Sequence, residues 1–265
     1  MTTAAQPGAL AERGFGKTQR RDAWWIAPAL TALVLGSFGI YATWAAYINK
    51  AYEWGPYLSP FYSPLIKTHW WPLSPAFLIL VFPLGFRATC YYYRKVYYRA
   101  FFLDPVACAV GEPRHGYRGE TKFPLIIQNI HRLFMYAAVV FIFILAYDVY
   151  LAARWPVNGV LADGTMAAGP VRFGVGLGTI VMAVNVILLS SYTFGCHSLR
   201  HLIGGGVDCY SCARAGKARF RLWRGVTVLN KRHMLWAWCS LFSVALTDVY
   251  IRLCAMGVIH DVRIF

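Results

Sequence analysis

The densest group of metal-binding residue types lies between residues 196 and 212. His197 and His201 are four residues apart, so on a helix both imidazoles face the same side. Three consecutive glycines then end that helix, and Cys209 and Cys212 follow with the CxxC spacing of a metal-binding knuckle. Two His and two Cys side chains can hold zinc or a Rieske-type [2Fe–2S] centre. A reduced CxxC pair beside two interfacial histidines stays an equal alternative.

A second group of the same residue types is dispersed along the chain. Cys90 follows one apolar stretch, Cys108 lies in the next connection, and His131 and His233 each precede an apolar stretch. Facing helices of a bundle can supply ligands to an embedded cofactor in this way. Each of these residues also has an ordinary structural role, as a small buried side chain or an interfacial histidine. Cys196 can belong to either group.

Two carboxylates interrupt otherwise apolar stretches. The sequence Asp-Val-Tyr occurs once from Asp148 to Tyr150 and again from Asp248 to Tyr250. Ionisable residues inside a membrane are costly, and they are functional candidates by default. Arg252 lies four residues after Asp248, so a structural ion pair on one helix is the simpler role there. The other reading is a proton relay, or a hydrogen-bonding wall for the head group of a quinone.

The composition is that of an integral membrane protein. Hydrophobic residues make up 58% of the 265 residues and charged residues only 14%, whereas soluble domains carry about 25% charged residues. A soluble single domain and a disordered chain are therefore excluded. A transmembrane helix needs about 20 apolar residues. The sequence predicts an all-α bundle of five such helices within residues 23–258, at about 23–48, 71–93, 123–153, 173–199 and 233–258.

The Lys and Arg residues predict the orientation of this bundle. Nineteen of the 26 precede the first span or lie in the second-to-third and fourth-to-fifth connections, and only five lie on the opposite side. Because positive charge stays on the cytoplasmic side, residues 1–22 are expected in the cytoplasm and the tail 259–265 outside. Topology and anionic lipid headgroups thus explain the net charge of +15, and no nucleic-acid partner is expected.

Most histidines and cysteines fall on this same basic side. They are His115, His131, His197, His201 and His233, with Cys90, Cys108, Cys196, Cys209 and Cys212. Imidazoles and thiolates gathered at one depth indicate an iron–sulfur or haem centre.

Five short motifs carry a family resemblance. They are Cys90-Tyr-Tyr-Tyr-Arg-Lys95, Asp104-Pro-Val-Ala-Cys108, Asn129-Ile-His-Arg132, Cys196-His-Ser-Leu-Arg-His201 and Leu229-Asn-Lys-Arg-His233. In these motifs the chain resembles the membrane subunit of mycobacterial-type succinate dehydrogenase, the non-haem class of respiratory complex II. The resemblance covers most of the chain from Ala23 to Phe265.

The resemblance implies an anchor in the bacterial plasma membrane that carries a flavoprotein subunit and an iron–sulfur subunit on its cytoplasmic face. Succinate is then oxidised on a partner subunit, and no catalytic residue is expected on this chain. Electrons would pass through a Rieske-type [2Fe–2S] centre in the anchor to a membrane quinone, menaquinone or ubiquinone. For that centre we predict His197, His201, Cys209 and Cys212 as ligands, with Cys90, Cys108, His131, His233 and Cys196 as alternatives.

Two other functions stay open at this stage. Two stacked haems need four axial histidines at two depths, and the outer halves of the predicted spans contain no histidine. A single haem b remains an alternative, in a monohaem cytochrome b subunit of another respiratory complex. The alternative from another class is a non-redox membrane scaffold or transporter whose CxxC motif holds zinc.

Overall fold

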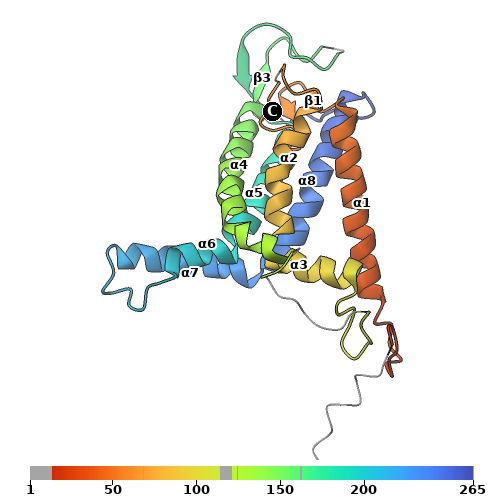
Figure 1. Ribbon diagram of the computed structural model, residues 1–265. Coiled ribbons are helices and arrows are strands. Elements are labelled where there is room, and N and C mark those ends of the chain that lie inside the picture. The colour runs from red at the N-terminus through yellow and green to blue at the C-terminus, as the bar shows by residue number, and fades with distance from the viewer. Residues whose placement is uncertain (1–13, 68, 114–120, 124, 162, 265) are drawn as a thin grey trace, which may run out of the picture. The chain divides into compact units, whose positions relative to one another are not determined.

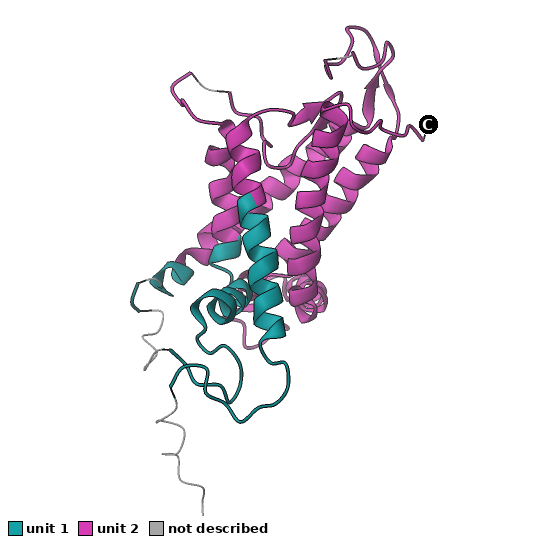
Figure 2. Cartoon of the chain, turned by 90° about the vertical axis from the view of Figure 1, so that its right-hand side faces the viewer, with its two compact units in different colours: residues 1–40, 87–129 teal, residues 41–86, 130–265 magenta. Residues whose placement is uncertain are grey.

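The computed structural model describes residues 14–67, 69–113, 121–123, 125–161 and 163–264. The chain divides into two compact units (Figure 2). The first unit comprises residues 1–40 and 87–129, and the second comprises residues 41–86 and 130–265.

Helices dominate the chain, and four of them are long and apolar enough to cross a membrane (Figure 1). They are α1 (Ile26–Ile48), the 3₁₀ helix η3 (Leu125–Ile130) continued by α4 (His131–Ala152), α5 (Leu177–Phe194) and α8 (His233–Ala255). A fifth span is counted when α2 (Pro75–Ala88) is taken together with α3 (Tyr91–Tyr97) and the π-helix η2 (Tyr98–Phe102) as one bent pair. The described chain therefore supports four spans, or five, where the sequence predicts five.

The stretch predicted as the second span, residues 71–93, contains two helices. Pro75 occupies the first position of α2, where its missing N–H costs no hydrogen bond. Cys90 then takes an extended backbone, with φ −65° and ψ 129°, and a new helix begins after it. The predicted fourth span, residues 173–199, is also broken, because α5 ends where Gly195 follows it and α6 (His197–Gly204) starts a new direction.

The chain also contains two short antiparallel sheets that the all-α prediction misses. β1 (Glu53–Trp54) pairs with β2 (Tyr57–Leu58), and β3 (Arg154–Pro156) pairs with β4 (Val171–Phe173). Strands of two or three residues leave no alternating pattern in the sequence that could predict them. Gly55 turns the first hairpin with a φ of 54°, a left-handed conformation that glycine adopts without steric cost.

Within the first unit, the segments around α3 are joined by hydrogen bonds. The Gln128 amide donates to the carbonyl of Ala88 at 3.2 Å and to the Tyr97 hydroxyl at 3.0 Å. Thr18 forms a β-bridge with Val110. These contacts connect the segment before α1 and the segment before α4 to the α3 region.

Within the second unit, α5 packs against both α4 and α8 (Figure 1). α2 approaches α4 closely, because a Cβ atom at Gly85 would lie only 2.3 Å from the Phe134 ring. α4 and α8 start at the end of this bundle where α5 finishes. At that end α6 and α7 (Gly216–Lys231) run across the direction of the bundle helices, and β1 to β4 lie at the opposite end (Figure 1).

Aromatic side chains form a core at the end of the second unit where β1 to β4 lie. Tyr57, Ala152, Trp155, Met182 and Ile251 form one buried hydrophobic cluster. The rings of Tyr57 and Trp155 meet edge to face, with centroids 5.6 Å apart. Such edge-to-face pairs stabilise a core beyond the apolar area that they bury.

A carboxylate beside the start of α5 ties residues 259–264 to this end. Asp261 accepts hydrogen bonds from the backbone N–H of Gly178 at 2.8 Å, from the Tyr57 hydroxyl at 2.8 Å and from the Tyr250 hydroxyl at 2.5 Å. A negative charge is favoured there, because the first N–H groups of a helix have no partner within the helix. Burial raises the pKa of Tyr57, so this hydroxyl keeps its proton and remains a donor.

Close packing between Tyr57 and the start of α5 makes a first prediction. A Cβ atom at Gly178 would lie 2.4 Å from the Tyr57 ring, and Tyr57 is held by Asp261 and only 1% exposed. We expect Gly178→Ala to lower the free energy of unfolding by about 1–3 kcal/mol, because the ring cannot move away without strain. Thermal unfolding of the purified complex measures this loss.

The matched control is Gly225→Ala in α7, where an added Cβ atom meets nothing within 4 Å. Alanine is the better helix former, so this variant should be as stable as the wild type or slightly more stable. Equal unfolding temperatures for the two variants would contradict the packing described here.

Candidate functional site

The four residues of the predicted local ligand set lie on the surface of the second unit. His197 and His201 are exposed on α6, and Cys209 and Cys212 are exposed in the turn between α6 and α7. The two cysteines form a disulfide with each other. The structure therefore does not bring the two imidazoles and the two sulfur atoms into one coordination set. No three His, Cys, Asp or Glu side chains in the described residues are placed as a ready metal site.

Two members of the alternative set are in direct contact. His131 is the first residue of α4, and Cys196 occupies the N-cap position of α6. The Nε2 atom of His131 lies 3.2 Å from the Sγ atom of Cys196. Cys196 is only 1% exposed, and its sulfur also accepts a hydrogen bond from the backbone N–H of Ser198 at 3.3 Å.

Stacked rings connect His233 to this pair. The Phe86 ring stacks on His131 with centroids 4.9 Å apart, and Tyr192 stacks on His233 at the same separation. The rings of Phe86 and Tyr192 meet edge to face, with centroids 5.3 Å apart. We call these four residues together with Cys196 the histidine cluster. It forms because α4 and α8 begin, and α5 ends, at one end of the bundle.

The other candidate cysteines belong to the first unit. Cys90 is buried and precedes α3 with nearly the backbone angles that Cys196 has before α6, φ −63° and ψ 136°. Cys108 is exposed, and its carbonyl accepts a hydrogen bond from Arg20 at 3.0 Å. His115 lies outside the described residues.

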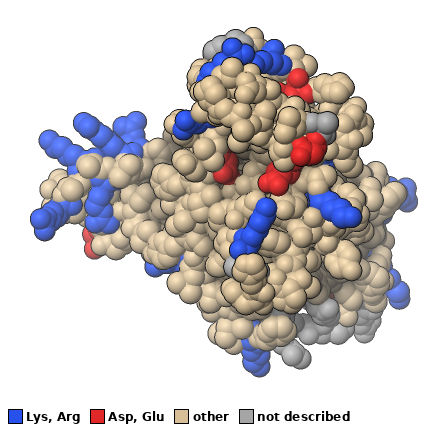
Figure 3. Space-filling model, turned by 90° about the horizontal axis from the view of Figure 1, so that it is seen from above, with Lys and Arg blue, Asp and Glu red and all other residues tan. Residues whose placement is uncertain are grey.

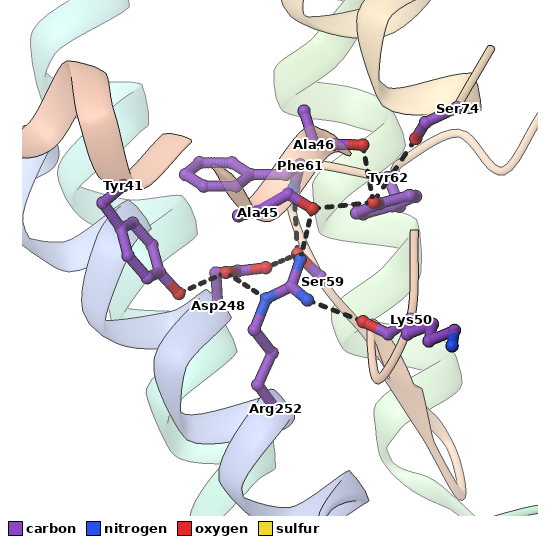
Figure 4. A network of polar contacts seen from close by, with 10 residues as sticks. All are labelled: Tyr41, Ala45, Ala46, Lys50, Ser59, Phe61, Tyr62, Ser74, Asp248 and Arg252. Atoms are coloured by element: carbon purple, nitrogen blue, oxygen red, sulfur yellow. Dashed lines mark hydrogen bonds and ion pairs between the residues drawn. The ribbon is translucent and has the colours of Figure 1, made fainter. Parts of the chain in front are cut away.

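The ion pair suggested by the spacing of Asp248 and Arg252 is present (Figure 4). Arg252 Nε lies 2.7 Å from Asp248 Oδ2, and both side chains are almost completely buried. Asp248 also accepts hydrogen bonds from the Tyr41 hydroxyl at 2.5 Å and from the Ser59 hydroxyl. The carboxylate is therefore matched by one cation and two hydroxyl donors.

The remaining donors of Arg252 reach the end of α1. Its two terminal nitrogens donate to the carbonyls of Lys50 at 2.6 Å and Ala45 at 2.9 Å. The Tyr62 hydroxyl donates to the same Ala45 carbonyl at 2.8 Å (Figure 4). Asp248 and Arg252 thus join α8 to the last turns of α1 and to the loop after β2.

Asp148 has a different environment from Asp248. It is 8% exposed and accepts a hydrogen bond from the Ser63 hydroxyl. Within the described residues no Lys, Arg or His lies within ion-pair distance of Asp148. Asp148 is consequently a buried carboxylate that the surrounding structure does not neutralise.

One loop supplies the serine donors to both carboxylates. Ser59 and Ser63 are fully buried, together with Tyr62 between them. The sequence reasoning missed these residues, because two Ser-Pro steps after a short strand look like an ordinary surface turn. Only the density of aromatic residues in this connection hinted that it is buried.

The two tyrosines of the Asp-Val-Tyr motifs point away from the carboxylates. Tyr150 is 56% exposed, and Arg154 lies over its ring at 5.7 Å. Tyr250 donates its hydroxyl to Asp261. The repeated tripeptide therefore does not make two equivalent sites.

Comparison with known proteins identifies the family. The family of actinobacterial succinate dehydrogenase subunit SdhC matches residues 26–257 of the chain. The chain belongs to this family. It is thus a subunit of an enzyme complex whose succinate-oxidising site lies on another subunit. A chain of the Mycobacterium smegmatis Sdh1 complex in the apo form is 45% identical, with a TM-score of 0.81 and 94% of each chain covered. No curated protein sequence matches.

The different surroundings of the two aspartates make a second prediction. Arg252→Gln leaves the Asp248 charge buried without its cation, a loss that typically costs about 3–5 kcal/mol. We expect this variant to lower the yield and unfolding temperature of the complex strongly. The double variant Asp248→Asn with Arg252→Gln leaves no unpaired buried charge, so it should recover part of the lost yield and unfolding temperature.

Asp148→Asn is the matched control, because it removes a carboxylate without leaving a cation unpaired. We expect its unfolding temperature to stay close to that of the wild type. A loss in Asp148→Asn as large as that in Arg252→Gln would show that the assigned charge pairing is wrong.

Proposed function

We propose that this subunit anchors the soluble part of succinate dehydrogenase to the bacterial plasma membrane and passes electrons from succinate to a membrane quinone. The family assignment and the apolar helices support the anchoring role. The proposed partners are the flavoprotein subunit and the iron–sulfur subunit, and the quinone is menaquinone or ubiquinone. The basic connections predict a cytoplasmic N-terminus, and we propose that the partners dock on that same side.

The observation that carries the electron-relay proposal is the histidine cluster. A Rieske-type [2Fe–2S] centre takes two imidazole and two thiolate ligands. The side chains present meet this requirement in part: His131 lies against the thiol of Cys196, whereas His233 is connected to them only through the rings of Tyr192 and Phe86. We propose these three residues as ligands in place of the local set. A second thiolate would complete the centre.

Helix ends favour a negatively charged group at this position. His131 and His233 begin α4 and α8, and Cys196 caps α6. The N-terminus of a helix carries a partial positive charge and unpaired N–H groups, which stabilise anions. The reduced centre carries a net negative charge, so the start of α6, where the Ser198 N–H donates to the Cys196 sulfur, would stabilise it.

The residues of the cluster then have defined tasks. His131, His233 and Cys196 would hold the iron, and the centre would supply one-electron transfer between the soluble subunits and the quinone. The rings of Phe86 and Tyr192 fix the orientation of the two imidazoles and exclude water from their faces.

Electron paramagnetic resonance of the reduced complex tests the ligand proposal. We expect Cys196→Ser and His131→Gln each to abolish or shift the signal of the centre and to abolish quinone reduction. Succinate oxidation by a soluble dye should persist, because it needs only the partner subunits.

The control is Cys209→Ser with Cys212→Ser, which should keep both the signal and quinone reduction. The double variant His197→Ala with His201→Ala should behave in the same way. If these two controls lose the signal while Cys196→Ser keeps it, the local set is the correct one.

An optical spectrum separates the iron–sulfur centre from a haem. A haem b held between two histidines gives an intense Soret band, whereas a Rieske-type centre gives weak, broad absorption. We expect no Soret band from the purified complex. Metal analysis completes the comparison, since a zinc-holding subunit would contain zinc without iron or acid-labile sulfide at this centre.

Asp148 is the proposed proton carrier for quinone reduction. Asp248 is neutralised by Arg252, whereas Asp148 faces a serine hydroxyl and can exchange a proton without breaking an ion pair. We expect Asp148→Asn to change the pH profile of quinone reduction, measured from pH 5 to pH 9. Ser63→Ala keeps the carboxylate and should shift the profile less. An unchanged profile in Asp148→Asn would remove this residue from the proton path.

A further inference from the structure

The hairpin of α6 and α7 is a defined unit that the proposed electron path does not use. Arg219 donates to the carbonyl of Ile203 at 3.0 and 2.8 Å, and Arg200 donates to the Thr227 hydroxyl at 3.0 Å. The Arg200 guanidinium also lies 4.8 Å from the centre of the Trp223 ring. These two arginines connect α6 to α7.

The hairpin connects two helices that are apolar enough to span a membrane. It follows α5 and precedes α8. Figure 1 shows α6 and α7 running across the direction of α4, α5 and α8. An amphipathic helix pair that connects two spans and runs perpendicular to them can lie in the plane of the lipid headgroups.

The charge of the hairpin is strongly one-sided. Residues 197–232 contain eight Lys or Arg residues and a single carboxylate, Asp208. In Figure 3 many Lys and Arg side chains gather on the part of the molecule that projects to the left. Lys217, Arg221 and Arg224 are exposed on α7 at spacings of four and three residues, so they share one face of that helix.

Apolar side chains lie beside this basic face. Leu222 is 60% exposed on α7, and Ala218, Gly225 and Leu229 share its side of the helix by their spacing. Leu202 on α6 is 44% exposed. Basic and apolar faces side by side are typical of helices that lie in the plane of a lipid surface.

We propose that the α6–α7 hairpin binds anionic phospholipid headgroups through Lys217, Arg221 and Arg224, with Leu222 reaching the acyl layer. The charge of the phosphate complements the basic face, and Leu222 is an exposed apolar side chain beside that face. This inference does not depend on which residues hold iron.

The test uses the delipidated, detergent-purified succinate dehydrogenase complex. Binding of dioctanoyl phosphatidylglycerol, which is anionic, is compared with binding of dioctanoyl phosphatidylcholine by native mass spectrometry. Each basic residue near an anionic lipid surface contributes about fivefold in binding. We expect the triple variant Lys217→Gln, Arg221→Gln and Arg224→Gln to lose at least tenfold in affinity for the anionic lipid.

A matched triple variant controls for the loss of charge. Lys67→Gln, Arg154→Gln and Arg172→Gln remove three exposed charges from the connections at the strand end of the second unit, and the affinity should stay within twofold of the wild type. Raising the salt concentration from 50 to 500 mM should reduce the preference of the wild type for the anionic lipid. If the hairpin triple variant does not assemble, the three single variants replace it, each with a loss of about fivefold.

Equal binding of the anionic lipid by the wild type and the hairpin variants would overturn the proposal. If those variants also release the soluble subunits, the basic face belongs to a protein partner. Failure of the ligand variants described above leaves this test unaffected, because lipid binding is measured without turnover.

Discussion

Hydrocarbon offers no hydrogen bonds to a peptide backbone, and this constraint shapes the second unit of the chain. Helices satisfy their own backbone groups except in the first and last turns, so polar chemistry collects at helix ends. His131 and His233 each begin a helix, and Cys196 caps a third. Because α4 and α8 start where α5 finishes, these donors meet at one end of the bundle. The histidine cluster is a consequence of antiparallel packing.

The same constraint explains the opposite end of this unit. Asp248 lies seven residues before the end of α8, yet it is completely buried. Its charge is tolerated because Arg252 and two hydroxyl groups surround it, and because Arg252 in turn satisfies carbonyls at the end of α1. Removing one member of such a network leaves the other buried polar groups without their hydrogen-bond or ion-pair partners. Asp148 lacks this compensation among the described residues, which separates a structural aspartate from a candidate for proton transfer.

Much of this architecture can be predicted from the sequence. The long apolar stretches predict helices such as α1 and α8, and the spacing of Asp248 and Arg252 predicts their ion pair. The break after α2 was not predicted, since apolar character continues through Tyr91 to Tyr93 while the helix changes direction. The buried serines Ser59 and Ser63 were missed as well, because their burial follows from tertiary packing around Asp248 and Asp148.

The candidate ligands show the limits of predicting a metal site from the spacing of residues in a short motif. The CxxC motif at Cys209 and Cys212 favoured a local set, but in the structure these two sulfur atoms are bonded to each other on an exposed turn. The contact of His131 with Cys196 joins residues 65 positions apart, and no short motif encodes such a distance. Both residues were nevertheless predicted as alternative ligands, because of their residue types and their expected depth in the membrane.

We propose that two histidines of this subunit hold an iron–sulfur centre. Pulsed electron paramagnetic resonance of the reduced complex, prepared with ¹⁵N-labelled histidine, measures it directly. We expect hyperfine couplings from two histidine nitrogens, with one coupling removed in His233→Gln if a centre still assembles there. A reduced complex whose additional centre couples to no histidine nitrogen, or which contains no such centre, would contradict histidine ligation.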